Sequence, residues 1–101
     1  MHKLKENMES IIQIKKECLV CGLSATLHKH HVFFGVSNRK KSEQDGCWVW
    51  LCHHHHNGSK DGVHFNIKLD REIKRMTEEK WLNYYNKTID DFIQRYGRNY
   101  L

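Results

Sequence analysis

The hydrophobic residues nearest the N-terminus are spaced as on one face of a helix. Between positions 3 and 16 they stand at i, i+4, i+7 and i+8, with lysine and glutamate at other positions. The stripe consists of Leu4, Met8, Ile11 and Ile12. This pattern predicts an N-terminal helix within residues 1–17.

The middle of the chain, residues 18–66, has a different pattern. Short β-like runs at Thr26 to Phe34 and at Cys47 to Leu51 alternate with turn signals such as Asp45-Gly46 and Asn57-Gly58. All four cysteines and eight of the nine histidines fall in this zone. We therefore expect two short strands joined by turns, with the chemistry of the protein beside them.

Residues 67–101 return to helical spacing. One stripe lies within 69–85 and a second within 89–96, where Thr88 is a suitable N-cap and Gly97 a suitable end. The apolar residues of the two stripes are Leu69, Ile73, Met76, Trp81, Leu82, Tyr85, Ile89, Phe92, Ile93 and Tyr96. The three zones predict an α+β protein, and a length of 101 residues suits a single domain, 1–101.

Composition indicates that this domain needs more than its apolar core. With 39% hydrophobic residues and a mean hydropathy of −0.79, the chain can bury only a thin core, which often requires a metal or a disulfide. The chain contains nine histidines and four cysteines but no proline. We find no apolar stretch suited to a membrane span or signal peptide and expect a cytoplasmic protein, where paired cysteines usually bind metal.

The positive charge is concentrated in one part of the chain. Seventeen Lys and Arg against twelve Asp and Glu give a net charge of +5. No acidic residue occurs between Glu17 and Glu43, and this interval contains Lys29, Arg39, Lys40 and Lys41. The stretch is either a solvated basic loop or a segment that contacts phosphate groups.

Two pairs of residues have the spacing of zinc ligands. Cys18 and Cys21 form a C-x2-C pair followed by glycine, and Cys52 and His55 form a C-x2-H pair. Together they predict a closed Cys₃His structural zinc site. A Cys₄ site in which Cys47 replaces His55 is the alternative. It is less favoured, because positions 47 and 52 of one strand point to opposite faces. A redox C-x2-C pair is a further alternative, but it prefers a βαβ setting, which this sequence lacks.

The remaining histidines lie in segments that resemble a known family. HHVFFG, NRKKSE, DGCWVWLC, HHN and GVHFN occur in this order, and FIQRYGRNYL ends the chain. This order resembles the HNH (ββα-metal, or His-Me finger) endonucleases, and more narrowly the small phage and prophage proteins of that superfamily. The resemblance covers about residues 18–101. It implies a zinc-stapled ββα-metal core over 18–66, flanked by the N-terminal helix and two C-terminal helices.

The resemblance also implies roles for individual residues. In this family the second histidine of the pair is the general base and the first binds a divalent ion, which corresponds to His31 and His30. The histidine after LCxxH, His56, becomes another ligand from the short helix of the motif. The third ligand is His64, with Asn57 as the alternative. The catalytic ion can be Mg²⁺, Mn²⁺, Ni²⁺ or Zn²⁺.

The implied activity is metal-dependent nicking or cleavage of DNA with weak sequence specificity. Arg39, Lys40 and Lys41 are expected to contact the DNA backbone, which positions it without reading bases. The resemblance also suggests a phage-encoded protein in the host cytoplasm, with possible phage recombination or packaging partners and no membrane contact.

Two features of the family pattern are missing. The asparagine that usually precedes the second strand is absent near Gly46 and Cys47, so a backbone carbonyl is one candidate to orient the base. HxxxH is also absent, because position 60 is Lys60. Neighbouring strand residues face opposite ways, so His30 and His31 share a site only if the strand bends. These departures are the reason to keep an alternative function beside the endonuclease, namely a non-catalytic zinc-dependent module that binds DNA or a partner.

Overall fold

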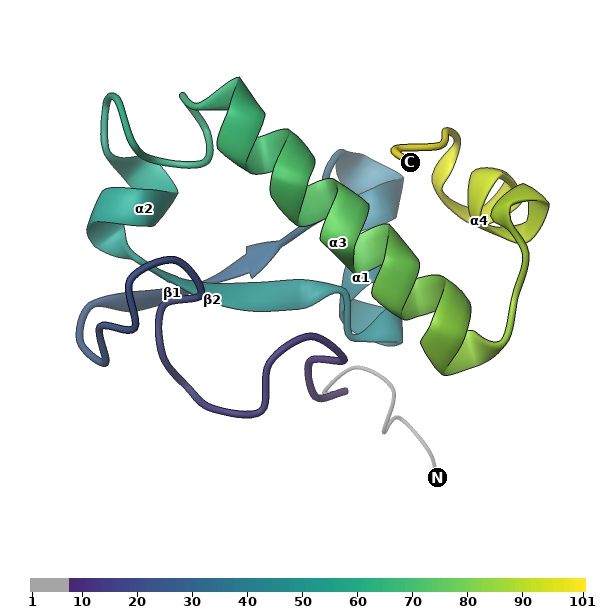
Figure 1. Cartoon of the computed structure of the whole chain (residues 1–101), viewed down its shortest axis with the longest axis horizontal. Helices are drawn as coiled ribbons and strands as arrows, with labels where there is room; N and C mark the ends of the chain where they lie inside the picture. The colour runs from purple at the N-terminus through teal and green to yellow at the C-terminus, as the bar shows by residue number, and fades with distance from the viewer. Residues whose placement is uncertain (1–7) are drawn as a thin grey trace.

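The chain folds as a two-stranded antiparallel sheet with helices packed around it (Figure 1). This computed structural model describes residues 8–101, so the first part of the expected N-terminal helix, with Leu4, lies outside the described residues. The elements in order are β1 (Leu27–His31), α1 (Val36–Asp45), β2 (Trp48–Cys52), α2 (His53–Asn57), α3 (Ile67–Tyr85) and α4 (Ile89–Tyr96). The expectation of a small α+β protein is confirmed.

The two strands pair over their full length, and β1 ends where its backbone groups form hydrogen bonds outside the sheet. Leu27 pairs with Cys52 and His31 with Trp48. The strand expected to reach Phe34 stops at His31, because the N–H and C=O groups of Phe33 bond to the Ser42 hydroxyl at 3.2 and 2.8 Å. The main chain thus leaves the sheet for a side chain of α1, and this change of partner bends it beside the last residues of β1.

Helix α1 replaces the basic loop expected between the strands. Its sequence, VSNRKKSEQD, has no apolar stripe, and Val36 is fully exposed. The residues that α1 buries are polar, namely Ser42 and Asp45. Since hydrophobic periodicity is the main signal of a helix in sequence, a helix anchored by polar groups gives no such signal.

The N-terminal helix prediction is wrong for residues 8–17, which are not helical. The Ser10 hydroxyl donates to the Trp48 carbonyl at 2.6 Å, and the Gln13 amide oxygen accepts from the Trp50 N–H at 2.6 Å. Ile11 and Ile12 pack against the core as their spacing suggested. The outer edge of β2 offers unpaired backbone groups, and bonds to them replace the bonds of a helix. In Figure 1 this dark purple segment passes below β2.

The two C-terminal helices have the ends that the sequence predicts. The Asn66 side chain caps α3 by accepting from the Leu69 N–H at 3.1 Å. Thr88 caps α4 in a reciprocal capping box with Asp91, and α4 ends at Gly97, which has a φ of 95°. The N-cap and end expected for the last helix are confirmed. Within residues 8–101, no helix combines the length and apolar character needed to cross a membrane.

Most of the chain contributes to one apolar core. Its buried residues come from the segment before β1, the sheet, the loops and the C-terminal helices: Cys18, Val32, Phe33, Cys47, Val49, Leu51, Cys52, Val63, Ile73, Trp81, Phe92 and Tyr96. In Figure 1, α3 crosses the molecule with α2 near its start and α4 beside its other half. The core therefore places α2 and the end of β1 on the opposite side of the molecule from the α3–α4 turn.

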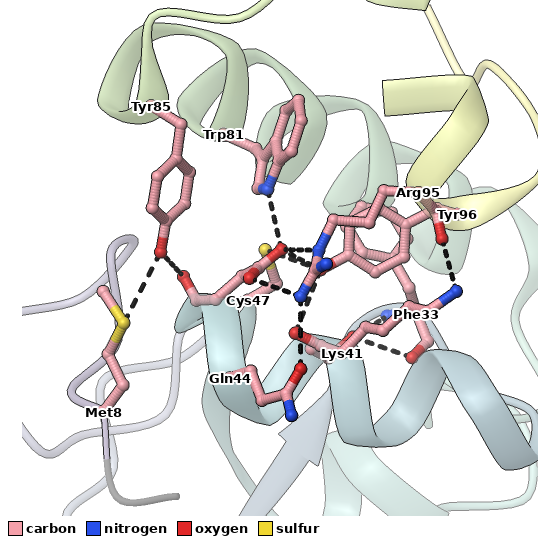
Figure 2. A network of polar contacts seen from close by, with 11 residues as sticks. Met8, Phe33, Lys41, Gln44, Cys47, Trp81, Tyr85, Arg95 and Tyr96 are labelled. Carbon is pink, nitrogen blue, oxygen red and sulfur yellow. Dashed lines mark hydrogen bonds and ion pairs between the residues drawn. The ribbon is translucent and has the colours of Figure 1, made fainter. Parts of the chain in front are cut away.

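A buried carboxylate joins three helices beside this core. Asp45, at the end of α1, accepts hydrogen bonds from Trp81 Nε1 at 2.8 Å and from the Tyr96 hydroxyl at 2.7 Å. The Arg95 guanidinium forms an ion pair with the same carboxylate. Figure 2 shows the labelled side chains of α3 and α4 converging on the end of α1. Each carboxylate oxygen is thus paired, as burial of a charge requires.

Asp45→Asn should lower the free energy of unfolding by about 2 to 3 kcal/mol, because the variant leaves Arg95 without its carboxylate partner. The value lies at the low end of the range for broken buried pairs, since the Arg95 side chain keeps 33% of its exposure. Urea denaturation measures the change. Asp90→Asn, on the exposed first turn of α4, is the matched control and should stay within about 0.5 kcal/mol of the wild type. Equal stability of the two variants would contradict the role of Asp45.

Candidate metal centres

Adjacent residues of the short helix α2 belong to two different clusters of potential metal ligands. One cluster contains Cys18, Cys21, Cys52 and His55, and the other contains His30, His56 and His64. In each cluster the candidate donor atoms lie within 4.8 Å of one another. The structure thus brings together both groups of residues that the sequence singled out, with His64 as the third histidine.

The Cys₃His cluster has the dimensions of a tetrahedral metal site. Cys21 Sγ lies 3.8 Å from Cys52 Sγ, and His55 Nδ1 lies 3.8 Å from Cys18 Sγ and 3.3 Å from Cys52 Sγ. Zinc bonds of about 2.3 Å to sulfur and 2.0–2.1 Å to nitrogen at tetrahedral angles would separate such donors by roughly 3.4–3.8 Å. The four side chains could therefore hold a metal such as zinc.

Local backbone geometry brings these four donors together. The Cys18 carbonyl accepts from the Gly22 N–H at 2.8 Å, which closes the turn that contains Cys21, and Gly22 takes a φ of 78°. Burial alone would raise the pKa of the Cys18 thiol, but backbone N–H groups, that of Cys52 first, donate to the sulfur and lower the pKa to about 6. Cys18 thus favours the thiolate, which is the form that binds metal.

Cys47 lies outside both clusters. Its side chain is fully buried in the core, and its sulfur lies 3.7 Å from the Tyr96 hydroxyl. Burial raises the pKa of this thiol to about 12, so it stays protonated. The interpretation of Cys47 as a small buried residue is confirmed, and the Cys₄ alternative does not fit the structure.

The ring nitrogens of the trihistidine cluster lie close to one another. His56 Nε2 lies 3.2 Å from His64 Nε2, and the His30 ring is 5.3 Å and 5.4 Å from those of His56 and His64. Burial and the neighbouring imidazoles lower the pKa of His30 to about 3, and burial lowers that of His56 to about 4. The His30 and His56 rings are therefore uncharged at neutral pH and keep a lone pair available for a cation.

One atom of this cluster needs a partner that the described part of the chain does not supply. His30 is 4% exposed, and its Nε2 has no hydrogen-bond partner within residues 8–101. A buried polar atom without a partner is costly, and most such atoms in proteins are satisfied. A cation shared with His56 and His64 would satisfy it, so the three residues fit a divalent ion.

His28 lies behind the cluster and contacts a metal-ligand candidate. Its Nδ1 is 2.9 Å from His56 Nδ1. If that His56 nitrogen carries the proton, its Nε2 keeps a lone pair on the side of His64, which is the arrangement that metal-binding histidines usually have. The Asn57 side-chain nitrogen is also 3.3 Å from His56 Nδ1, so Asn57 lies beside the rear nitrogen. Sequence patterns do not reveal this contact, because His28 and His56 are 28 residues apart.

His31 is held by an acidic residue that sequence reasoning missed. Its Nε2 lies 2.7 Å from a carboxylate oxygen of Glu43 on α1, and Lys29 Nζ lies 3.3 Å from the same carboxylate. A hydrogen bond from Nε2–H to Glu43 leaves the Nδ1 lone pair of His31 free to accept a proton. The group bonded to this ring is thus a carboxylate, and not the backbone carbonyl that was one candidate from the sequence. Glu43 is the first acidic residue after the basic stretch, which is its only signal in the sequence.

A small cavity joins His31 to the trihistidine cluster. It has a volume of about 120 Å³, and its lining consists of Lys29, His30, His31, Phe34, Arg39, His56 and His64. Both histidines of the pair reach it, because β1 ends at His31 and the chain bends there. The three basic residues predicted to contact DNA lie in different surroundings. Arg39 lines this cavity and Lys40 is exposed, whereas Lys41 Nζ donates to the Arg95 carbonyl at 2.8 Å.

Comparison with known proteins adds no assignment. No protein-family model, curated protein or solved structure matches this chain. The likeness to the HNH endonucleases therefore rests on the motifs of the sequence and on the side chains gathered around this cavity.

Cys52→Ser should remove one equivalent of tightly held zinc per chain and lower the melting temperature, because one of the four donors of the Cys₃His cluster is lost. Metal content after dialysis and thermal unfolding measure both effects. Cys47→Ala is the matched control, since it removes a buried thiol outside the cluster and should keep the wild-type metal content. A wild-type protein whose melting curve stays the same after chelation would contradict a structural metal.

Proposed function

We propose that the protein is a metal-dependent endonuclease that hydrolyses phosphodiester bonds in DNA, with His31 as the general base. The observation that carries the proposal is the shared cavity. His31, bonded to Glu43, faces the same small space as the three histidines of the cluster and the side chain of Arg39. Phosphodiester hydrolysis needs an activated water, a cation near the phosphate and relief of charge on the leaving oxygen.

His31 would take the proton from the attacking water. With Nε2–H donating to Glu43, the free Nδ1 is the accepting atom, and the carboxylate stabilises the imidazolium that forms. The bond to Glu43 also restricts rotation of the ring. Lys29 shares the Glu43 carboxylate and compensates part of its negative charge in a site that must receive a phosphate.

His30, His56 and His64 would hold the divalent ion. Imidazole donors suit Zn²⁺ and Ni²⁺ better than Mg²⁺, with Mn²⁺ between them. A divalent ion bound there supplies a Lewis acid that polarises the phosphate and stabilises the leaving oxygen. The three histidines occupy only part of a coordination sphere, which leaves room for the substrate. His28 keeps His56 turned toward this position.

The order of the elements supports the same proposal. Two antiparallel strands are followed by a short helix, with the histidine pair at the end of β1 and His56 on α2. This is the order that the HNH resemblance implies. Zinc in the Cys₃His cluster would fix α2 through His55 and would thereby place the neighbouring His56.

His31→Ala should reduce plasmid nicking by roughly 10²- to 10⁴-fold, the usual contribution of a general base. Zinc content and melting temperature should not change. The assay follows conversion of supercoiled plasmid to the relaxed form with Mg²⁺, Mn²⁺, Ni²⁺ or Zn²⁺. His54→Ala, an exposed histidine that contacts Asp61, is the control and should keep full activity. A wild-type protein that shifts the plasmid but never relaxes it would instead be the non-catalytic binding module.

Glu43→Ala should lower kcat by roughly 10- to 100-fold through loss of the bond that orients His31. KM for the plasmid should not increase, because no group that binds phosphate is removed. Glu43→Gln keeps an oxygen acceptor for His31 Nε2–H and should recover part of the rate. A purely structural role would instead lower the melting temperature and give no recovery in Glu43→Gln.

A further inference from the structure

A second basic cavity is lined by Lys74, whose ammonium lies over the Phe34 ring of the trihistidine cavity. We propose that this basic groove, formed by Arg71, Lys74, Arg75, Arg98, Asn99 and Tyr100, binds backbone phosphates of the DNA strand that enters the cleavage site. The cavity has a volume of about 310 Å³ and lies between α3 and the chain that follows α4. The inference rests on the proposed function, because it names the path of the same substrate.

The groove carries an excess of unpaired positive charge. Within residues 8–101, no ion pair or side-chain hydrogen bond engages the guanidinium groups of Arg71, Arg75 or Arg98. Asp70 is the acidic residue of the lining, and its carboxylate is paired with Lys74 Nζ at 2.9 Å. Three guanidinium groups thus face one cavity with all of their donors available, which is how proteins bind phosphate in two-point contacts.

The C-terminal side of the groove is held in place before any ligand binds. The Tyr100 N–H donates to a carboxylate oxygen of the buried Glu78 at 2.7 Å, and the Tyr100 ring stacks on Phe33 with centroids 5.5 Å apart. The Arg98 guanidinium lies over the Tyr100 ring at 4.9 Å. Contacts to the core therefore fix the side chain on which Arg98 rests, and less conformational freedom is lost on binding.

Lys74 connects the groove to the proposed cleavage site. Its ammonium lies 4.2 Å from the centre of the Phe34 ring and 5.3 Å from that of Tyr100. Phe34 lines the trihistidine cavity, and its ring is 6.3 Å from that of His64. The Phe34 ring of the trihistidine cavity is thus in contact with Lys74 of the groove, so a strand held in the groove would pass close to the reacting phosphate.

The spacing of the cations suits a polymer. Arg71 and Arg75 are four residues apart on α3, which is about 6 Å along the helix axis, so they can bind separate phosphates of one strand. Such contacts position DNA without reading its sequence. The expected ligand is therefore a DNA backbone that passes from the groove to His31.

The test compares two triple variants that each remove three positive charges. Arg71→Gln/Arg75→Gln/Arg98→Gln should weaken binding of a labelled DNA duplex roughly tenfold or more at 0.1 M salt, and should reduce the slope of log K against log salt by about 2 to 3. Fluorescence anisotropy without added divalent ions measures both. Lys15→Gln/Lys16→Gln/Lys87→Gln, at exposed positions outside the groove, is the control and should change the slope by less than about 1.

Equal effects of the two triple variants would overturn the inference. Displacement of the duplex by inorganic phosphate at equal ionic strength would also overturn it, because the groove would then be a site for free phosphate. If the Arg triple variant loses its native melting transition, the single variant Arg75→Gln is used in its place. That exposed residue should lower the salt slope by about 1, and an unchanged slope would contradict the inference.

Plasmid nicking separates this inference from the proposed function. The Arg triple variant should show a raised KM with an unchanged kcat, since its substitutions lie outside the cavity of His31. A wild-type protein that binds through the groove but never nicks would overturn the endonuclease proposal and leave the groove in place. If the wild-type protein nicks the plasmid and the Arg triple variant binds DNA as tightly as the wild type, the inference about the groove is overturned and the endonuclease proposal stands.

Discussion

The carboxylate of Asp45 is the contact on which the arrangement of the candidate site depends. Helix α1 has no apolar face, so the polar side chains of Ser42 and Asp45 hold it on the core through Phe33 and the side chains of α3 and α4. Glu43, which binds His31, lies between these two anchors. The same helix carries Arg39 to the cavity. A polar network on one side of the core thus sets the orientation of a histidine on the other.

The position of helix α2 determines where another side chain of the same cavity, His56, lies. A helix of five residues is not stable by itself, so its position depends on what its side chains bind. His55 faces the three cysteines and His56 faces the other histidines. One peptide bond therefore separates the two clusters, and any shift of the first displaces a donor of the second. The fold places a cluster of four potential metal ligands directly beside a cluster of three.

The sequence predicts the parts of this protein that depend on short-range patterns. Ligand spacing grouped Cys18 with Cys21 and Cys52 with His55, and cap residues located the last helix between Thr88 and Gly97. Contacts between distant polar groups could not be predicted in this way. The missed helix α1, the non-helical residues 8–17 and the bond from His31 to Glu43 all depend on such contacts. The basic groove is of the same kind, because Arg98 joins Arg71 only through the packing of Tyr100.

The N-terminal segment also covers part of one edge of the sheet. The Trp48 carbonyl accepts from the Ser10 hydroxyl, and both backbone groups of Trp50 are bonded, to the Gln13 side chain and to the Leu19 N–H. An open strand edge is a template for intermolecular sheet growth, so a strand of another molecule could pair with this part of β2 only by displacing residues 10–19. The segment that failed to form a helix therefore limits edge-to-edge association along β2 in a sheet of only two strands.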